Sequence, residues 1–388
     1  MAAQQSFTIA EDSSVYYGGG YWNDLPQVRD YIESRSTGKP ATRWFQHLKQ
    51  VHGDKPFRKA LFLNCGNGWV ERDLLREGVC LEAVGTDISV ELLEQARKEA
   101  AEHGLNARYY GGDINTAELP EGDYDLVVNF AAAHHIAHLD KVLRKVAEVL
   151  PEDGVFVSVD YVGPHRNQYG YEHWEAASAL NASLPEQYRS SFSYPHLPTM
   201  LAGDPTEAIH SELILETVDR YFRLEELNPV GGGLAYLVLS HNAGLHADPE
   251  GAEQDRIIRD VLDADAAWTK DHDPLFVFFW GHPNKDVLTD QGRLDAWSRE
   301  EEERERRAAA NGGEYYPLSL LQQLTQEVET LKLHTSHMRA DLHALGMSGP
   351  PGAPQAPSLK RTLVLTLDAR APQVARALRG VRRRVGKS

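Results

Sequence analysis

Two adjacent histidines and one carboxylate are the residues best suited to acid–base chemistry in this chain. His134 and His135 follow a strand-like run at 124–129, and Asp160 ends another run at 155–160. An imidazole can accept a proton near neutral pH, and a neighbouring carboxylate can orient it. We therefore predict that His135 acts as a general base, with His134 and Asp160 at the same site. The alternative is structural, since a lone buried histidine usually serves packing.

Three histidines close in sequence also raise the question of a metal site. The spacing of His134, His135 and His138 does not place three ligands cleanly around one ion. We predict no metal at this position.

The elements that must position these residues alternate between strand-like and helix-like patterns from residue 58 to about 284. This alternation is typical of an α/β sheet. The predicted strands are 60–64, 81–86, 107–110, 124–129, 155–160, 221–227 and 275–280. The predicted helices are 69–77, 90–103 and 139–150, preceded by two near 26 and 42–51. Residues 172–216 are mostly helical and irregular, as expected of a lid.

The ends of the first three strands carry glycines and carboxylates. Gly66 and Gly68 follow the first strand, and Asp87 lies 19 residues after Gly68 at the end of the second. Asp113 closes the third. Parallel strands place such residues at one edge of a sheet, where backbone N–H groups can approach a ligand. The pattern predicts a nucleotide-shaped ligand across that edge.

Together with two later motifs, this stretch resembles the class I S-adenosylmethionine-dependent methyltransferases. The later motifs are D-L-V-V-N-F at 125–130 with A-H-H-I at 133–136, and L-P-E-D-G-V-F-V at 150–157. The resemblance covers about residues 59–164, and more loosely extends to 283. It implies a doubly wound, mostly parallel seven-stranded sheet with a helical lid. It also implies S-adenosylmethionine as the cofactor.

Carried onto this sequence, the resemblance implies that Asp87 binds the ribose hydroxyls, Ile88 covers the adenine and Asp113 accepts from its amine. The full implied cofactor set is Asn64, Gly66, Asn67, Gly68, Asp87, Ile88, Asp113, Ile114 and Asn129. Asn64 stands where the family usually has an acidic residue, and Trp69 where it often has glycine. A nicotinamide-dependent enzyme is the main competitor, but its third glycine position holds Glu71 here.

The chain divides into four predicted regions. Residues 1–57 form an N-terminal cap segment, 58–284 the methyltransferase domain, 285–346 a helical region, and 347–388 a Pro/Gly linker with a basic tail. Apolar positions from Leu324 to Leu345 alternate spacings of four and three, which predicts a coiled coil. The alternative is an amphipathic helix packed on its own domain.

Charge is unevenly distributed along the chain. The net charge is −17, yet residues 359–388 contain nine basic residues and a single acidic one, Asp368. An acidic body disfavours a nucleic-acid partner, because phosphate contacts need basic grooves. A basic amphipathic tail suits an anionic membrane surface, and a disordered extension is the alternative. We expect a cytoplasmic protein, peripheral to the inner membrane face, that forms homo-oligomers through the coiled coil.

The predicted reaction is methyl transfer to a hydroxyl oxygen. The layout of a methyltransferase with a coiled coil and a basic end resembles some bacterial glycan-modifying enzymes, so a sugar or glycan is the first expected acceptor and a natural product the second. Two alternatives remain open. One is an N-methyltransferase acting on a small amine, and the other is a catalytically weak scaffold subunit that keeps the fold.

Overall fold

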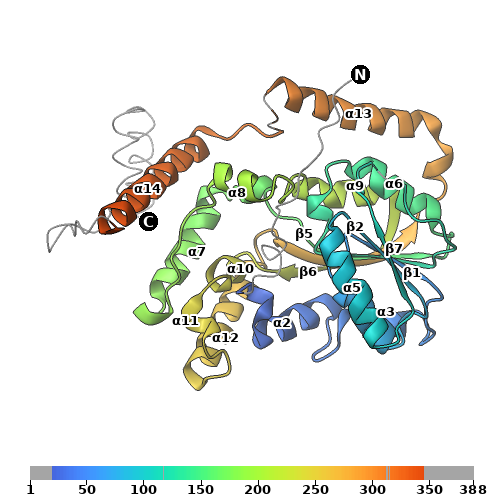
Figure 1. Cartoon of the computed structure of the whole chain (residues 1–388), viewed down its shortest axis with the longest axis horizontal. Coiled ribbons are helices and arrows are strands. Elements are labelled where there is room, and N and C mark those ends of the chain that lie inside the picture. The colour runs from blue at the N-terminus through green and yellow to red at the C-terminus, as the bar shows by residue number, and fades with distance from the viewer. Residues whose placement is uncertain (1–19, 117, 312, 314, 345–388) are drawn as a thin grey trace. The chain divides into compact units, whose positions relative to one another are not determined.

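A seven-stranded sheet with helices on both faces is the main feature of the computed structural model (Figure 1), which describes residues 20–116, 118–311, 313 and 315–344. The strand order is β3-β2-β1-β4-β5-β7-β6. The first five strands are parallel, and β7 is antiparallel to both of its neighbours. The strands are β1 Ala60–Leu63, β2 Ala83–Asp87, β3 Ala107–Gly111, β4 Leu126–Phe130, β5 Val155–Tyr161, β6 Phe222–Gly231 and β7 Phe276–Pro283.

This sheet confirms the predicted fold class. Each predicted strand is present, and most of the ends differ from the prediction by no more than two residues. The largest difference is β6, which continues to Gly231 with two register shifts opposite β7. Such irregularities bend a strand and add local twist. The alternating hydrophobic pattern of the sequence does not encode them.

Side chains of the central strands alternate between two cores. In β1, Leu61 and Leu63 belong to one hydrophobic cluster, while Ala60 and Phe62 belong to another. Because neighbouring residues of a strand point to opposite faces, both faces of the sheet are covered, which explains its almost unbroken apolar strands. The first face packs on helices α6 Leu139–Val149, α9 Ile214–Tyr221 and α13 Gln291–Ala310; the second packs on α3 Trp44–Val51 and α4 Trp69–Arg76.

A third cluster lies beside the sheet. It joins α2 Pro26–Thr37 to α10 Ala235–Leu239 and α12 Ala252–Trp268 through apolar residues such as Val28, Val238 and Ile258. Asp265, fully buried near the end of α12, accepts hydrogen bonds from backbone N–H groups at the start of α10. The remaining helices are α5 Val90–Glu102, α7 Tyr171–Ser183, α8 Leu197–Gly203, α11 Ala243–His246 and α14 Leu320–Ala344.

The order of the strands creates a reversal point between β1 and β4. From β1 the chain moves outward through β2 to β3, and then returns to add β4 and β5 on the other side. At such a reversal the loops after the two central strands diverge and leave a crevice at the carboxyl ends. The glycine turn after β1 and the histidines after β4 both lie at this edge.

Two compact units divide the chain. One contains the sheet and runs through Phe192 and again over Met200–Tyr315, so it includes α13. The other combines Ser193–Thr199 with the segment from Tyr316 onward. Within this second unit, Gln326 of α14 accepts a hydrogen bond from the Leu197 N–H (2.8 Å) and donates one to the Pro195 carbonyl (2.7 Å).

The helix α14 carries the predicted coiled-coil seam, but its seam positions differ in exposure. Leu324 and Val328 are buried, whereas Leu331 is 57% exposed. The coiled coil therefore stays a prediction. The basic tail at 359–388 lies outside the described residues.

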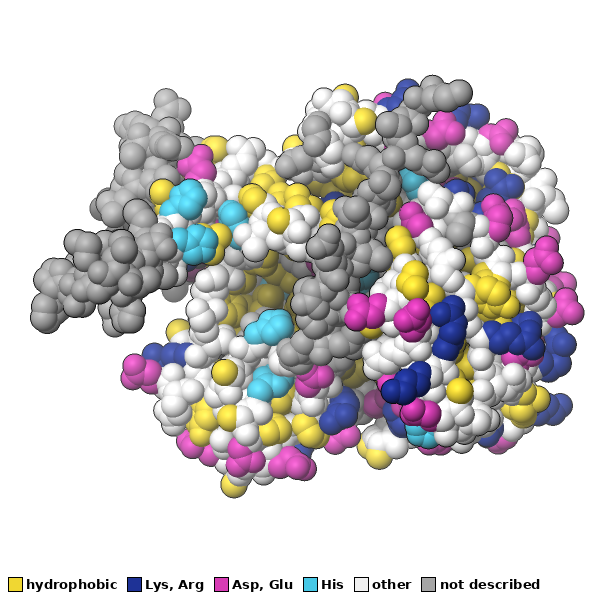
Figure 2. Space-filling view, in the orientation of Figure 1, with side chains coloured by type: hydrophobic (Ala, Val, Ile, Leu, Met, Phe, Trp, Pro, Cys, Tyr) yellow, Lys and Arg dark blue, Asp and Glu magenta, His cyan; other side chains and the backbone are white. Residues whose placement is uncertain are grey.

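Charged side chains of both signs are interspersed on the face that Figure 2 shows over α3 and α5. Among the described residues, no helix is both long and apolar enough to cross a bilayer. The expected partners and location of the protein stay predictions.

Candidate functional site

The turn after β1 is built from residues with left-handed backbone conformations. Asn64, Gly66 and Gly68 have φ angles of 46°, 56° and 72°. Glycine adopts this conformation without strain, and asparagine tolerates it better than most residues. At Gly68 a Cβ would also lie 2.6 Å from the Tyr109 hydroxyl oxygen. The turn therefore brings the chain tightly from β1 into α4, whose first residue is Trp69.

A buried carboxyl group lies in the first turn of α4, directly after this turn. Glu71 of α4 is fully buried, and burial raises its pKa to about 8. Its Oε1 would lie 2.5 Å from a Cβ at position 85, so β2 must carry glycine there. In a dinucleotide-binding turn, a small residue at the position of Glu71 lets the helix pack closely on the sheet. Here the helix carries the large side chain, and Gly85 of β2 makes room for it. The sequence alone did not reveal this exchange.

Asp87 ends β2 beside the turn. Its two oxygens accept hydrogen bonds from the backbone N–H groups of Gly66 and Ser89, both at 2.8 Å. Burial raises its pKa, and these two donors partly counteract the rise. Each carboxylate oxygen keeps a second acceptor position for a ligand hydroxyl. The next residue, Ile88, is 39% exposed, which places an apolar surface beside this carboxylate.

Asp113, after β3, is tied to the loop after β4. Its Oδ1 accepts from the backbone N–H and the side-chain amide of Asn115, both at 2.9 Å. Asn115 Oδ1 in turn accepts from the N–H groups of Ala137 and His138 at 3.0 Å. Ile114 between them is buried in the core. This network joins the cofactor edge of the sheet to the histidine loop.

Asp160 is fully buried at the end of β5. Burial alone would raise its pKa, but His134 and several hydrogen-bond donors hold it below its usual range. The donors are Asn129 Nδ2 (2.6 Å), the N–H groups of Ala132 (3.1 Å), Ala133 (2.7 Å) and Tyr161 (2.7 Å), and His134 Nδ1 (2.5 Å). Asn129, implied as a cofactor residue, is 1% exposed and donates to this carboxylate. Its role toward the cofactor stays a prediction.

The predicted pair of histidines occupies the loop after β4, with ring centroids 4.2 Å apart. Although burial lowers the pKa of His134, the adjacent Asp160 carboxylate raises it overall to about 9. Burial and the neighbouring His134 lower the pKa of His135. The two rings therefore differ in charge near neutral pH, with His134 protonated and His135 neutral.

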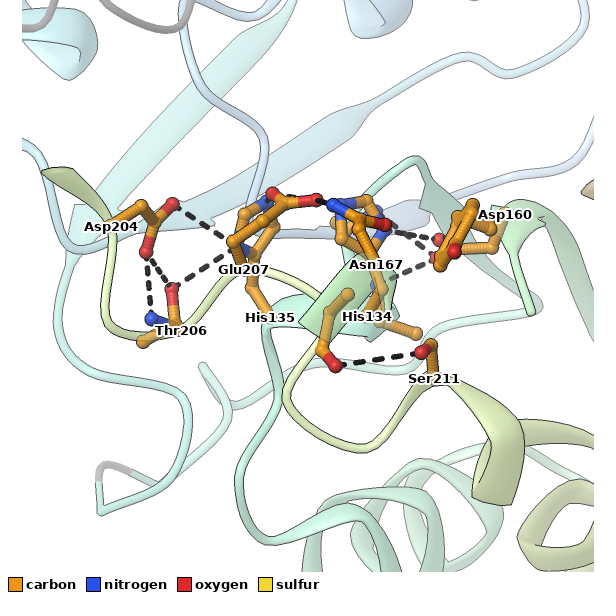
Figure 3. Close-up of polar contacts among 12 residues, drawn as sticks. His134, His135, Asp160, Asn167, Asp204, Thr206, Glu207 and Ser211 are labelled. Atoms are coloured by element: carbon orange, nitrogen blue, oxygen red, sulfur yellow. Dashed lines mark hydrogen bonds and ion pairs between the residues drawn. The ribbon is translucent and has the colours of Figure 1, made fainter. Parts of the chain in front are cut away.

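His135 is oriented by residues of the lid. Its Nδ1 lies 3.1 Å from Thr206 Oγ1, and this hydroxyl donates to Asp204 Oδ1 at 2.6 Å (Figure 3). Because the Thr206 proton is directed at Asp204, its oxygen accepts from His135 Nδ1–H. This arrangement fixes the tautomer and places the lone pair on Nε2.

Glu207 completes the cluster from the same lid segment. Its Oε2 lies 3.7 Å from His135 Nε2 and 3.9 Å from His134 Nε2. The Asn167 amide donates to its other oxygen, Oε1, at 3.1 Å. Arg166 donates to the carbonyls of Pro205 (2.7 Å) and Glu207 (2.9 Å), and so fixes the backbone that carries this carboxylate. Figure 3 shows Glu207 and Asn167 beside the two imidazoles.

The structure thus brings His134, His135 and Asp160 together as predicted and adds four residues that sequence reasoning missed: Asn167, Asp204, Thr206 and Glu207. His138 is separate, since its Nδ1 faces Glu305 at 3.9 Å. In the predicted N-terminal cap segment, burial and, to a smaller extent, the negative charge of Glu207 raise the pKa of Tyr21. Residues 1–19 of that segment lie outside the described residues.

The comparison with protein families matches residues 60–154 to the model of a methyltransferase domain. This range begins with β1 and ends just before β5, so it includes the glycine turn, Asp87, Asp113 and both histidines. The chain carries a class I S-adenosylmethionine-dependent methyltransferase domain.

The cofactor of this family is S-adenosylmethionine. The carboxyl ends of β1, β2 and β3 with the turn after β1, here called the cofactor edge, fit it. The left-handed turn at Gly66 and Gly68 carries no side chains at these two positions, and Asp87 keeps acceptor positions beside it. The exposed face of Ile88 suits an adenine ring. Asn64 has a conformational role here through its left-handed backbone, and its amide lies 3.4 Å from the Ala132 carbonyl.

Curated relatives resemble the methyltransferase domain over limited stretches. An uncharacterized methyltransferase, YcgJ of Bacillus subtilis, is 36% identical over 84 residues, or 21% of this chain and 33% of that protein. A fatty-acid O-methyltransferase of Mycolicibacterium smegmatis is 25% identical, over 44% of this chain and 60% of that protein. The mitochondrial arginine-hydroxylase NDUFAF5 of Rattus norvegicus is 27% identical, over 36% and 37%. The chain spans less than two thirds of each of these relatives.

Proposed function

We propose that this protein transfers the methyl group of S-adenosylmethionine to a hydroxyl oxygen of a small acceptor. The observation that carries the proposal is the position of His135. It follows β4, which pairs directly with β1 at the reversal point of the sheet, so it lies at the same edge as the glycine turn after β1. An imidazole is thus held beside the cofactor edge, where a reacting hydroxyl must lie.

The bound cofactor supplies an electrophilic methyl group, and the chain supplies alignment and proton removal. Thr206 holds Nδ1–H of His135 and leaves the Nε2 lone pair to accept the proton of the acceptor hydroxyl. Asp160 holds the neighbouring His134 in place and compensates its charge. The mobile proton therefore moves to His135, while His134 remains a fixed cation beside it.

Oxygen is also the acceptor atom in the name of the Mycolicibacterium relative, a fatty-acid O-methyltransferase. A carboxylate acceptor carries no proton at neutral pH and needs no base. A hydroxyl acceptor carries a proton that a base must remove. The imidazole beside the cofactor edge therefore supports a sugar, glycan or natural-product hydroxyl as the acceptor of this protein. The acceptor classes are separable by their dependence on His135.

The experiment is a transfer assay with methyl-labelled S-adenosylmethionine and a panel of sugars, glycans, phenolic natural products, fatty acids and amines. With a hydroxyl acceptor we expect His135→Ala to lower the rate by about 100-fold or more, in the range of general-base catalysis. With a fatty acid or an amine acceptor the variant would keep most of its activity. That outcome would replace the hydroxyl proposal with carboxyl or N-methylation.

A catalytically weak scaffold would give a different result. It would show no labelled product with any acceptor, or product formation that persists in Asp87→Ala. Because one relative is named an arginine-hydroxylase, the readout must be the labelled methyl group in the product rather than cofactor consumption alone.

A further inference from the structure

We propose that the two imidazoles and Glu207 also form a binding site for a divalent transition-metal ion. Each residue offers one donor atom, an imidazole nitrogen or a carboxylate oxygen, and these atoms all lie within 4.8 Å of one another. The nitrogens that face Glu207 are Nε2 of His134 and Nε2 of His135. Among the described residues, this is the one group of three histidine, cysteine or acidic side chains whose donor atoms lie close enough together to hold a metal ion. The inference concerns the site of the proposed function, but it does not need the reaction to occur.

Both imidazoles are already oriented as metal ligands. A histidine that binds a metal through one nitrogen usually donates from its other nitrogen to a carboxylate or another acceptor. His134 Nδ1 donates to the buried Asp160 carboxylate, and His135 Nδ1 donates to Thr206, which Asp204 holds. Each ring therefore presents Nε2 to the same side, toward Glu207. Metal binding displaces the proton that His134 Nε2 carries in the metal-free protein.

The carboxylate has a similar support. Asn167 donates to Glu207 Oε1, and so turns Oε2 toward the imidazoles, at 3.7 Å from His135 Nε2 and 3.9 Å from His134 Nε2. Ligands about 2.0–2.1 Å from a tetrahedral ion lie about 3.3 Å apart. The Glu207 oxygen therefore needs to approach each imidazole by about half an ångström. The two imidazole nitrogens, which lie within 4.8 Å of each other, must close by up to about 1.5 Å.

The ligand set selects the class of metal. Two imidazoles and one carboxylate suit Zn²⁺, Co²⁺, Fe²⁺ or Mn²⁺, whereas Mg²⁺ and Ca²⁺ prefer an all-oxygen shell. Three protein ligands leave positions open for water or for an acceptor oxygen. A spacing argument restricted to His134, His135 and His138 misses this site, because its third ligand comes from the lid, 72 residues after His135.

Metal ligation and proton acceptance use the same lone pair of His135, so they exclude each other. In the metal-loaded protein an acceptor hydroxyl would instead coordinate the ion, which lowers the pKa of that hydroxyl. The metal-free protein would retain the imidazole base. The two states predict different responses of methyl transfer to a chelator.

The experiment is calorimetric titration of Zn²⁺ into the untagged full-length chain after chelator treatment, paired with the absorption spectrum of the Co²⁺ form. We expect one ion per chain and a visible Co²⁺ spectrum of tetrahedral or five-coordinate type. Glu207→Gln and His135→Ala should each weaken binding by about 100-fold. His282→Ala is the matched control, since this histidine contacts Gly154 far from the cluster and should leave binding unchanged.

No stoichiometric Zn²⁺ binding by the folded wild type, or equal binding by wild type and Glu207→Gln, would overturn the site. Circular dichroism of each variant separates loss of ligands from loss of fold. Methyl transfer by a protein that binds no Zn²⁺ would defeat only this inference. Stoichiometric Zn²⁺ binding by a protein that transfers no methyl group would defeat only the proposed function.

Discussion

The cofactor edge and the histidine cluster lie at the same end of the sheet, but they are assembled in different ways. The cofactor edge uses the turn after β1 and the ends of β2 and β3, all within residues 63–115. The histidine cluster draws side chains from the ends of β4 and β5, from residues 166–167 and from the lid at 204–207. The first region is local in sequence, whereas the second depends on how the lid folds.

This difference implies that substitutions can impair one region without impairing the other. Damage to the turn should reduce cofactor binding or stability and leave the imidazoles intact. Damage to the lid contacts should reduce transfer and leave cofactor binding intact. Four substitutions test the separation, from the largest expected effect to the smallest.

The largest effect is expected at Glu71 in the first turn of α4, and it concerns the pH dependence of stability. Its folded-state pKa of about 8 exceeds the usual value of about 4.3, so folding keeps it neutral. The unfolded chain ionises this carboxyl at a lower pH than the folded protein does. The free energy of unfolding is therefore highest below about pH 4 and falls as the pH rises to 8, by an amount on the order of 4 kcal/mol. In Glu71→Gln this loss should disappear, as measured by urea unfolding at pH 5 and pH 8. The exposed Glu94→Gln is the control, and an identical pH dependence in Glu71→Gln and wild type would contradict the account.

Thr206→Val tests the lid side of the comparison. Without the hydroxyl, His135 loses the group that holds Nδ1, so kcat should fall by about 10- to 100-fold through misalignment. The Kd for S-adenosylhomocysteine should not change, and Thr206→Ser should restore activity. A fall in cofactor affinity instead would show that the lid and the cofactor edge act as one unit.

Much of this comparison was visible in the sequence. Strand–helix alternation, the glycine spacing and Asp87 predicted the sheet and its cofactor edge, because these features are encoded by neighbouring residues. The sequence also placed Asp160 at the histidine site, since parallel strands bring their ends together. It did not reveal that Asp160 holds His134 while Thr206 holds His135. It did not reveal Glu207, Asp204 or Thr206, because no periodicity fixes the path of the irregular segment before α9. Nor did it reveal that Gly85 makes room for Glu71.

Ile88→Ala refines the cofactor edge. Removing an exposed apolar face that covers an adenine should cost about 1 kcal/mol of binding, or about a fivefold rise in Kd. Leu81→Ala is the control, since Leu81 is also exposed but lies before β2, at the opposite edge of the sheet. Equal effects of the two substitutions on cofactor affinity would remove the adenine role of Ile88.

The smallest effect is expected for Asn64→Gly. Because Asn64 has a φ of 46°, glycine should preserve the turn and leave cofactor affinity unchanged within about twofold, whereas Asn64→Ala should lose about 1 kcal/mol of stability. Thermal unfolding and cofactor titration measure the two quantities. A large loss of affinity in Asn64→Gly would show that the amide itself binds the cofactor.

The central claim is that one edge of the sheet binds the cofactor while a separate cluster activates the acceptor. Calorimetric titration of S-adenosylhomocysteine into wild type, Asp87→Asn and His135→Ala tests it most directly. We expect binding by wild type and equal affinity in His135→Ala. In Asp87→Asn we expect the affinity to fall by about 100-fold or more, because the amide weakens the two charge-assisted hydrogen bonds expected with the ribose hydroxyls. No binding by wild type, or the same loss in both variants, would contradict the account.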